Sequence, residues 1–265
     1  MPEKSLVAKF KSVDQRLIQC CHAMNQYLYI GAGSEGIVYR TQDGFSLSEF
    51  YKIDDSYVTA LTDYGNALFV GSSPGGNIFM HNFNTGNRFQ YVITGDYRVT
   101  SFCTFKDKLY AGTSPSGLVL SFDGNSWKTE YDCYGAGIKG MSALGDKMYV
   151  FVENVEFILC LSESGWAFVK SGDKDFSLAS SKKVNTTIET LKQNPDYDFS
   201  FSCSCVAGDK VYFCPQNRCN LYSYDGTTVS IVYQWSGNQI SAIESIGDKQ
   251  LFVAVDDIVY VTELL

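Results

Sequence analysis

The sequence predicts an all-β protein, a single six-bladed β-propeller with four antiparallel strands in each blade. Three kinds of observation support the prediction: a recurrent aromatic residue, short strand-like segments around each copy of it, and glycine-containing turns between those segments. The successive aromatics lie 40, 41, 39, 63 and 40 residues apart, and they are Tyr29, Phe69, Tyr110, Tyr149, Tyr212 and Phe252. A period of about forty residues built from short strands is the sequence signature of a β-propeller.

The first three repeats have nearly the same layout. They read YLYIGAGSEGIVYRTQDG at 27–44, ALFVGSSPGGNIFMHNFNTG at 67–86 and KLYAGTSPSGLVLSFDG at 108–124. Glycines stand at two fixed positions after the aromatic, first Gly31, Gly71 and Gly112, then Gly36, Gly76 and Gly117. Glycines in such places indicate a turn with positive φ or a close approach of neighbouring backbone. A phosphate-binding loop is the alternative for 31–36, but that motif must lead into a helix, and here another strand, 37–40, follows.

Each repeat divides into four strands. In the second repeat, alternation and β-branched or aromatic content predict strands at 58–63, 67–72, 77–83 and 88–94. A glycine-containing turn separates the third and fourth strands, at Asp43-Gly44, Thr85-Gly86, Asp123-Gly124, Ser164-Gly165 and Asp225-Gly226. Such turns between apolar runs are a strong hairpin signal. A Gly-Asp-Lys or Lys-Asp-Lys turn, as at 106–108, separates the first two strands, and its aspartate is expected to cap the turn.

The domain organisation follows from the two irregular repeats. The sixth repeat supplies only three strands, so residues 1–12 are expected to provide the closing strand of the last blade, which makes 1–265 one domain. The long gap before Tyr212 holds an insertion, 171–198, between blades four and five. A loop of this length is either functional or disordered. Its candidate protein-binding residues are Lys174, Lys182, Lys183, Thr187, Glu189 and Lys192.

Composition excludes several classes of function. The formal net charge is -8, and no cluster of lysine or arginine stands out, which argues against binding to nucleic acid. The first twelve residues contain no apolar core of a secretory signal, and no apolar run approaches the roughly 18 residues of a membrane helix. The nine cysteines are therefore expected to be reduced thiols, as in a protein made in a cytosol.

No residue set predicts a metal, a cofactor or a catalytic site. Four cysteines, Cys203, Cys205, Cys214 and Cys219, would suffice for zinc, but the first two alternate with serines along a strand, which favours a place in the core. The two histidines, His22 and His81, are too few for a typical metal site. Most aromatics fall at alternating strand positions and are expected to be core. Trp127, Trp166 and Trp235, near the starts of outer strands, are expected to pack within their blades.

A glycosidase is the enzymatic alternative. The turns at 39–47 and 121–130 partly match the Asp-box of sialidase-like propellers, Ser-x-Asp-x-Gly-x-x-Trp. A sialidase also needs three clustered arginines, whereas the five here are scattered through different strand classes. The paired carboxylates at 54–55 and 256–257 lie in turns, where solvated side chains are the default. The sequence thus favours a protein that is not an enzyme.

The repeat at 110–124, Tyr-x-Gly-Thr-Ser-Pro-x-Gly-x-Val-x-x-Phe-Asp-Gly, resembles propeller repeats in virion structural proteins of tailed bacteriophages. It also resembles repeats in bacterial extracytoplasmic sensor domains, which are exported and usually joined to a membrane segment. The phage resemblance covers 27–124 closely and two further repeats loosely. It implies a protein-binding assembly subunit of a virion (adaptor, tail or fibre-associated) that is made in the host cytoplasm and binds other proteins. A glycan- or receptor-binding, lectin-like propeller is the alternative, and a sialidase-like glycosidase comes third.

Overall fold

The protein is built from β-strands alone wherever its structure is described. A computed structural model describes residues 7–11, 18–42, 46–144, 146–152, 157–170, 201–207, 210–215, 219–224, 229–235, 240–246, 250–256 and 258–263. Every regular element in these ranges is a strand. The all-β prediction is therefore confirmed for this part of the chain.

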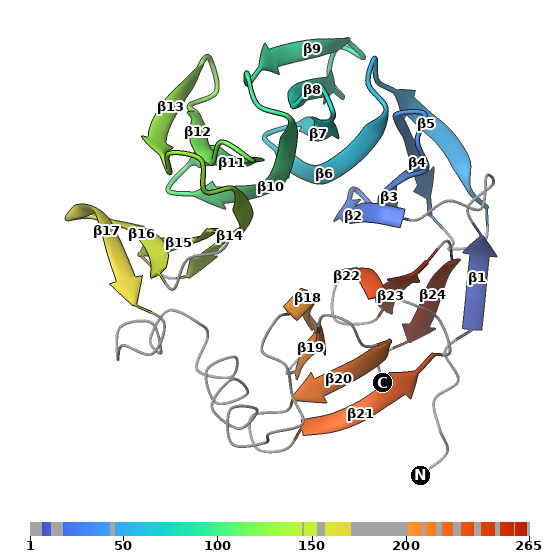
Figure 1. The fold of residues 1–265 in the computed structure, drawn as a ribbon. Coiled ribbons are helices and arrows are strands. Elements are labelled where there is room, and N and C mark those ends of the chain that lie inside the picture. Colours follow the sequence, from blue (N-terminus) through green and yellow to red (C-terminus); the bar gives the residue numbers. More distant parts are fainter. Residues whose placement is uncertain are drawn as a thin grey trace. The chain divides into compact units, whose positions relative to one another are not determined.

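The strands form six four-stranded antiparallel sheets, three in each of two compact units (Figure 1). The first unit comprises 1–52 and 181–265, and the second comprises 53–180. The sheets of the first unit are β2 (Ile18–Met24), β3 (Tyr27–Ala32), β4 (Ile37–Thr41) and β5 (Ser48–Lys52); β18 (Phe201–Ala207), β19 (Lys210–Pro215), β20 (Asn220–Tyr224) and β21 (Val229–Gln234); and β22 (Ile240–Ile246), β23 (Gln250–Val255) and β24 (Ile258–Glu263) with β1 (Val7–Lys11).

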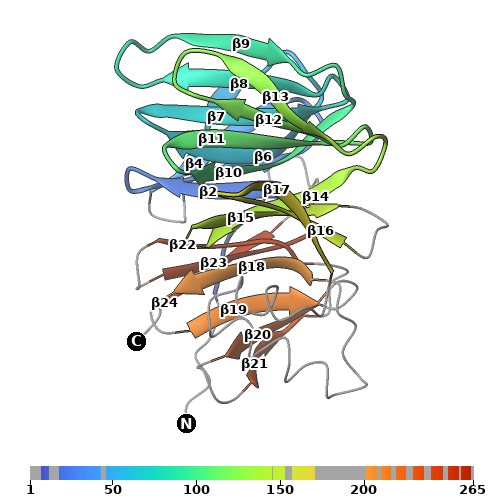
Figure 2. The same ribbon diagram turned by 90° about the vertical axis from the view of Figure 1, so that its left-hand side faces the viewer.

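The second unit contains the sheets of the second, third and fourth repeats, and Figure 2 shows the strands of each lying side by side in sequence order. They are β6 (Tyr57–Tyr64), β7 (Ala67–Ser73), β8 (Asn77–Asn82) and β9 (Arg88–Ile93); β10 (Arg98–Phe105), β11 (Lys108–Ser114), β12 (Leu118–Phe122) and β13 (Trp127–Asp132); and β14 (Ile138–Leu144), β15 (Lys147–Val152), β16 (Phe157–Ser162) and β17 (Gly165–Lys170). The four strands predicted for the second repeat agree with β6–β9 within one residue at each end.

One sheet joins the two ends of the chain. β1 pairs antiparallel with β24, with Val7 opposite Val261 and Lys11 opposite Ile258. The order within that sheet is β1-β24-β23-β22, so the last three strands of the chain gain their fourth strand from its beginning. The outer edge of β24 is thereby paired, which removes an exposed row of backbone donors and acceptors.

The six recurrent aromatics are core residues. Each lies on the second strand of its sheet, and the buried set is Tyr29, Phe69, Tyr110, Tyr149, Tyr212 and Phe252. In the second unit, Phe69 contacts Phe122 with ring centroids 5.6 Å apart and Trp127 at 6.2 Å. Both partners belong to the next sheet, so the recurrent aromatic helps to join one sheet to its neighbour.

The glycine two residues after the aromatic marks a close approach between sheets. A Cβ atom on Gly71 would lie 2.6 Å from Cγ1 of Val99, and one on Gly112 would lie 2.7 Å from Cγ2 of Ile138. Val99 and Ile138 stand near the starts of β10 and β14, each on the following sheet. Of the two predicted roles for these glycines, close approach is the one that applies, because neither has a positive φ.

The sheets β6–β9 and β10–β13 of the second unit run in the same direction. The Thr59 hydroxyl, near the start of β6, donates to the carbonyl of Val99 near the start of β10, at 2.6 Å. The Tyr64 hydroxyl, at the end of β6, donates to the carbonyl of Asp107 just after β10, at 2.5 Å. The ends where the first strands begin therefore lie together, and so do the turns where they finish.

Each first strand also carries one extra residue relative to its partner. The register shift falls close to the start of the paired segment in all six sheets. The extra residues are Gln19, Thr59, Thr100, Lys139, Ser202 and Ser241, and all are polar. A bulge of this kind re-aims a side chain and increases the local twist. Strand alternation alone does not reveal it.

Candidate functional site

Two aspartates, Asp55 and Asp96, hold the turns at the end of the second unit where the first strands of its sheets begin. The Asp55 carboxylate accepts hydrogen bonds from the Ser72 hydroxyl at 2.6 Å, from the Gly75 amide at 3.0 Å and from the Ser56 amide at 2.7 Å. The Ser72 hydroxyl in turn accepts from the Asn77 amide at 3.0 Å. One carboxylate thus joins the segment before β6 to the turn between β7 and β8.

The next sheet repeats the same brace. The Asp96 carboxylate accepts from the Thr113 hydroxyl at 2.6 Å, from the Ser116 amide at 2.9 Å and from the Tyr97 amide at 2.7 Å. The Thr113 hydroxyl accepts from the Leu118 amide at 3.0 Å. Asp96 is buried, as is Thr113, so this network lies largely out of water.

The expectation that the carboxylates at 54–55 are solvated turn residues is wrong for Asp55. Its side chain is committed to a structural network that spans 20 residues of sequence. The signal in the sequence is the recurrence of Asp three residues before a valine on the first strand, Asp55 before Val58 and Asp96 before Val99. Asp256 is the described member of the other pair, and its carbonyl accepts from the Ile18 amide at 2.9 Å.

Replacing Asp96 with alanine tests the brace. Because the change leaves a buried hydroxyl and two amides without their acceptor, we expect it to lower the free energy of unfolding by about 2–4 kcal/mol. Asp54→Ala, at an exposed neighbour of the equivalent aspartate, is the control and should cost less than about 0.5 kcal/mol. Urea denaturation of both variants measures the difference, and equal stabilities would refute the brace.

Three exposed tyrosines and an exposed isoleucine lie at the braced end of the second unit. Tyr57 opens β6, Tyr97 precedes β10, Tyr134 lies between β13 and β14, and Ile93 closes β9. Their exposed fractions are 41%, 60%, 91% and 71%, respectively. All four occupy the end of the second unit where first strands begin and outer strands finish. We call this surface the tyrosine end.

The backbone under two of these tyrosines is fixed by aspartates. The Tyr97 amide donates to Asp96, and the Tyr134 amide donates to the Asp132 carboxylate at 2.7 Å. Exposed aromatic side chains on turns held in this way lose little conformational entropy when a partner covers them. The sequence pattern assigned most aromatics to the core, and it missed these residues because they stand at strand starts or in turns, outside the alternation.

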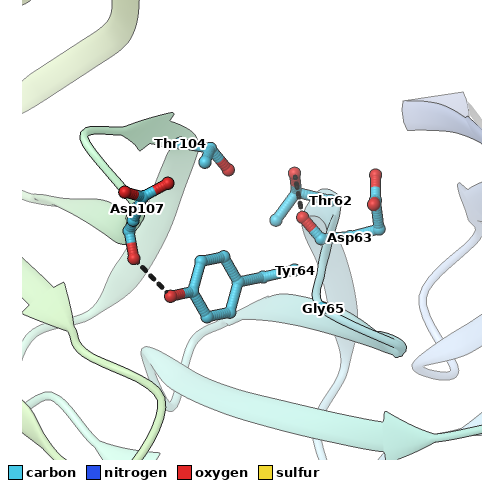
Figure 3. Close-up of a pocket in the computed structure, with 6 residues that line it drawn as sticks. All are labelled: Thr62, Asp63, Tyr64, Gly65, Thr104 and Asp107. Carbon is cyan, nitrogen blue, oxygen red and sulfur yellow. Dashed lines mark hydrogen bonds between the residues drawn. The ribbon is translucent and has the colours of Figure 1, made fainter.

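A hollow of about 500 Å³ lies at the opposite end of the same unit (Figure 3). It is formed by the finishing ends and turns of two neighbouring sheets, β6–β7 and β10–β11. Its lining residues are Thr62, Asp63, Tyr64, Gly65, Thr104 and Asp107. The Tyr64 hydroxyl bonds to the Asp107 carbonyl, which ties the two turns together. We call it the threonine–aspartate hollow.

Asp107 departs from its predicted capping role. Its hydrogen bond with Tyr64 uses the backbone carbonyl, and the residue lines the hollow. The two lysines beside it form ion pairs elsewhere: Lys106 Nζ lies 3.7 Å from Glu163, and Lys108 Nζ lies 3.8 Å from Glu130.

Some ionisable groups are buried elsewhere in the described residues. Burial raises the pKa of the Cys103 thiol to about 11, although a hydrogen bond from the Ala143 amide opposes the shift. A thiol in this state is protonated at neutral pH and a poor nucleophile. Burial also raises the pKa of Glu244 on β22, against the opposing influence of His22 on β2. Glu244 and His22 therefore interact electrostatically.

The insertion residues proposed for protein binding lie outside the described residues; they are Lys174, Lys182, Lys183, Thr187, Glu189 and Lys192. Among the described cysteines, Cys214 and Cys219 are buried and are not joined in a disulfide. The side chains of Cys203 and Cys205 are not among those described. Within the described part of the chain, no three histidines, cysteines or carboxylates group together as metal ligands, and no helix is long and apolar enough to cross a membrane.

The tryptophans pack against aromatics of their own sheets and of neighbouring sheets, so the prediction that they pack within their blades holds only in part. Trp127 stacks on Phe122 with centroids 5.2 Å apart, and Trp166 lies 5.3 Å from Tyr131. The predicted position of Trp235 is wrong, because it follows the end of β21 instead of standing near its start. Its amide donates to the Cys219 carbonyl at 2.9 Å, and its ring lies 5.3 Å from Tyr260.

No protein-family model matches the sequence, and no curated protein matches it. Several solved structures match the chain in fold. The WD40 beta propeller domain of Doa1 matches with a TM-score of 0.64 and 10% identity over 97% of this chain and 96% of that chain. Virginiamycin B lyase from Staphylococcus aureus matches with a TM-score of 0.55 and 9% identity over 97% of this chain and 98% of that one.

The extracellular domain of the putative hybrid two component system BT4673 from B. thetaiotaomicron gives a TM-score of 0.71 and 13% identity. It covers 99% of this chain but only 40% of the other, so this chain spans less than half of that protein. The matched proteins differ in kind, and at these identities the likeness concerns the fold alone. The sequence repeats and the four-stranded sheets agree with this likeness. The chain therefore has the β-propeller repeat fold.

Proposed function

We propose that this propeller is a non-enzymatic protein-binding module that holds other subunits in a larger assembly. The observation that carries the proposal is the tyrosine end, where Tyr57, Tyr97, Tyr134 and Ile93 are exposed and the backbone of Tyr97 and Tyr134 is held by aspartates. Tyrosine is enriched where proteins bind one another, since it offers a large, rigid surface with a polar tip. Loops on a rigid scaffold are the usual carriers of such recognition.

The assembly we propose is a bacteriophage virion, in which the chain is a tail, adaptor or fibre-associated subunit. This step is supported by the resemblance of the repeat at 110–124 to virion propellers. We further propose that the six sheets are blades of one closed ring, a form supported by the β1–β24 pairing. The net charge of -8 favours neutral or basic protein neighbours over DNA.

The distribution of ionisable groups supports a binding role over catalysis. Glu130, on β13, is bound by its own neighbours: the Ser121 hydroxyl donates to it at 2.7 Å, and Lys128 Nζ lies 3.0 Å away. Its pKa is lowered because these contacts and Lys108 outweigh the effect of burial. An active site requires groups that converge on a reacting atom, and Glu130 is engaged in structure. The Glu244–His22 pair is the place to test for activity.

The tyrosine end can be tested by a triple variant, Tyr57→Ser, Tyr97→Ser and Tyr134→Ser. We expect its melting temperature to stay within a few degrees of the parent's, because surface changes away from structural contacts usually cost within about 0.5 kcal/mol each. Stoichiometric co-sedimentation with the particle that contains the chain should be lost. The matched control is Ile231→Ser, at another exposed apolar residue on β21, which should retain it. Mass spectrometry of phage particles measures the stoichiometry.

Two further variants separate the alternatives. Replacing 171–198 with a short Gly-Ser linker asks whether the six insertion residues contribute to the same binding. Glu244→Gln, assayed with a broad glycosidase and esterase screen, asks whether the protein is an enzyme. Full particle binding by the triple tyrosine variant would contradict the proposed surface. A turnover abolished by Glu244→Gln would contradict the non-enzymatic proposal.

A further inference from the structure

One residue of the tyrosine end stands where the geometry of its turn disfavours a tyrosine. Tyr134 and Gly135 have φ +51° and +87°, and the Cys133 carbonyl accepts from the Ala136 amide at 3.3 Å. A four-residue turn with positive φ at both central positions is of type I′, and Asn-Gly, Asp-Gly or Gly-Gly usually fill it. Tyr134 therefore occupies a position that suits asparagine, where a bulky side chain makes the left-handed backbone more costly.

Tyr134 differs from the other described non-glycine residues with positive φ. Those residues have polar side chains, and they are Asn25, Gln26, Lys106, Asp107 and Asp256. Tyr134 is also 91% exposed, so packing within its own unit does little to offset the unfavourable conformation. Residues that break a local rule in this way are concentrated at functional sites. The side chain of Tyr134 is therefore expected to serve a contact outside the chain.

The turn beneath Tyr134 is fixed to its own sheet. The Cys133 amide donates to the Gly117 carbonyl at 3.0 Å. The Gly135 amide donates to the Ser116 carbonyl at 2.9 Å. Both acceptors belong to the turn between β11 and β12, and the bond from the Tyr134 amide to its aspartate adds a further restraint. The backbone that presents the ring needs little ordering when a partner binds, which favours affinity.

The neighbours of Tyr134 indicate the shape of a complementary surface. Cys133, Gly135 and Ala136 are small, so the tyrosine ring is the largest group of its turn. A ring that projects beyond small neighbours can enter a pocket whose walls contact both of its faces, whereas a flat surface would contact only one. The complementary surface is therefore a concave, mainly apolar pocket with a polar group for the phenolic hydroxyl.

The charge beside the ring also constrains the partner. Asp132 is exposed and lies two residues from Tyr134. Its Oδ1 accepts from the Tyr134 amide, and the exposed carboxylate can accept further hydrogen bonds. The exposed cations of the tyrosine end, Arg98 and Lys139, stand at the starts of other strands, so they adjoin other parts of this surface. A cationic side chain at the mouth of the partner's pocket would complement Asp132.

We propose that Tyr134 is the anchor of the tyrosine end: its ring enters an apolar pocket of a partner protein, beside a cationic side chain that pairs with Asp132. The inference rests on the proposed protein-binding function and adds to it the residue that carries most of the binding energy. Tyr57, Tyr97 and Ile93 form the surrounding contact that keeps water from the anchor.

The first part of the test measures stability and needs no partner. Tyr134→Asn should raise the melting temperature by about 2 °C, because asparagine adopts positive φ more readily than tyrosine. Tyr134→Phe keeps the ring and the strain and should leave the melting temperature unchanged. Tyr57→Asn is the matched control, at an exposed tyrosine without positive φ, and should give no gain. Differential scanning calorimetry of the full chain compares the three variants.

The second part measures binding to phage particles assembled without this chain. Purified full-length protein is added in increasing amounts, and co-sedimentation gives the half-saturating concentration. Tyr134→Asn should raise that concentration at least about thirtyfold, the loss expected of a dominant interface residue, whereas Tyr134→Phe and Tyr57→Asn should each raise it less than about fivefold. Asp132→Asn keeps an oxygen for the Tyr134 amide but removes the charge, so binding should weaken about threefold and depend less on salt.

Three results would overturn the anchor. The first is an unchanged or lower melting temperature for Tyr134→Asn, which would remove the argument from strain. The second is an equal loss of binding in Tyr57→Asn and Tyr134→Asn, which would spread the binding energy over the tyrosine end and leave the proposed function in place. The third is sedimentation of the parent, but not of Tyr134→Asn, with phosphatidylcholine vesicles, which would make the ring a lipid contact. Full binding by the triple tyrosine variant would instead contradict the proposed surface itself.

Discussion

Gly117→Ala should be among the most damaging single substitutions in this protein. A Cβ atom at this position would lie 2.0 Å from the carbonyl oxygen of Ala136, and the backbone there has φ +79°. Steric overlap with backbone cannot be relieved by a side-chain rotation, so the segment that leads into β14 must shift. We expect the free energy of unfolding to fall by about 3–5 kcal/mol, from overpacking and the left-handed conformation together.

Gly86→Ala separates the two contributions. Gly86 has nearly the same φ, +70°, but a Cβ atom added there would meet nothing within 4 Å apart from its chain neighbours. The control should therefore lose only the conformational part, about 1–2 kcal/mol. Urea denaturation of both variants gives the difference directly. Similar losses for the two would mean that the contact with Ala136 yields easily and that the sheets are less tightly joined than the structure indicates.

Removal of residues 1–12 should have the other large effect. The deletion takes away β1 and leaves the backbone donors and acceptors along one edge of β24 without partners. We expect a loss of several kcal/mol, on the order of 3 or more, together with self-association through the exposed edge. Size-exclusion chromatography and thermal melting measure the two consequences.

A synthetic peptide of residues 1–12 provides the second arm of this experiment. Added in excess to the truncated protein, it should restore the monomer and raise the melting temperature, because it can pair with β24 as β1 does. Deletion of residues 1–4 alone, which leaves β1 intact, should change neither property. A truncated protein that stays monomeric with the parent's melting temperature would refute the closing role of the N-terminal strand.

The sequence was most informative where local rules determine structure. The spacing of Phe69 and its five counterparts located the second strand of every described sheet, because each is a buried residue on that strand. The fixed glycines were also located, but the sequence left their role open between a turn and a close approach. The need for glycine at position 71 follows from its close approach to Val99, which comes from another sheet.

The candidate sites were less predictable, since they depend on contacts between distant segments. The Asp96 brace joins residues up to 20 positions apart, and the recurrence of Asp55 and Asp96 does not identify the partners of either carboxylate. The hollow depends on Tyr64 reaching the turn of the next sheet, 43 residues away. Individual residues such as Asp107 were noticed, but as elements of turns. The sequence did not show which turns lie next to one another in the fold.

The sheet built from both chain ends has a consequence for how such a protein can change in evolution. Its β1 strand comes from the beginning of the chain and β22–β24 from its end, whereas each of the other five sheets is built from four consecutive strands. A duplication or loss of a whole internal repeat would add or remove one complete sheet and leave this joint untouched. The number of repeats is thus free to vary while the means of joining the termini stays the same.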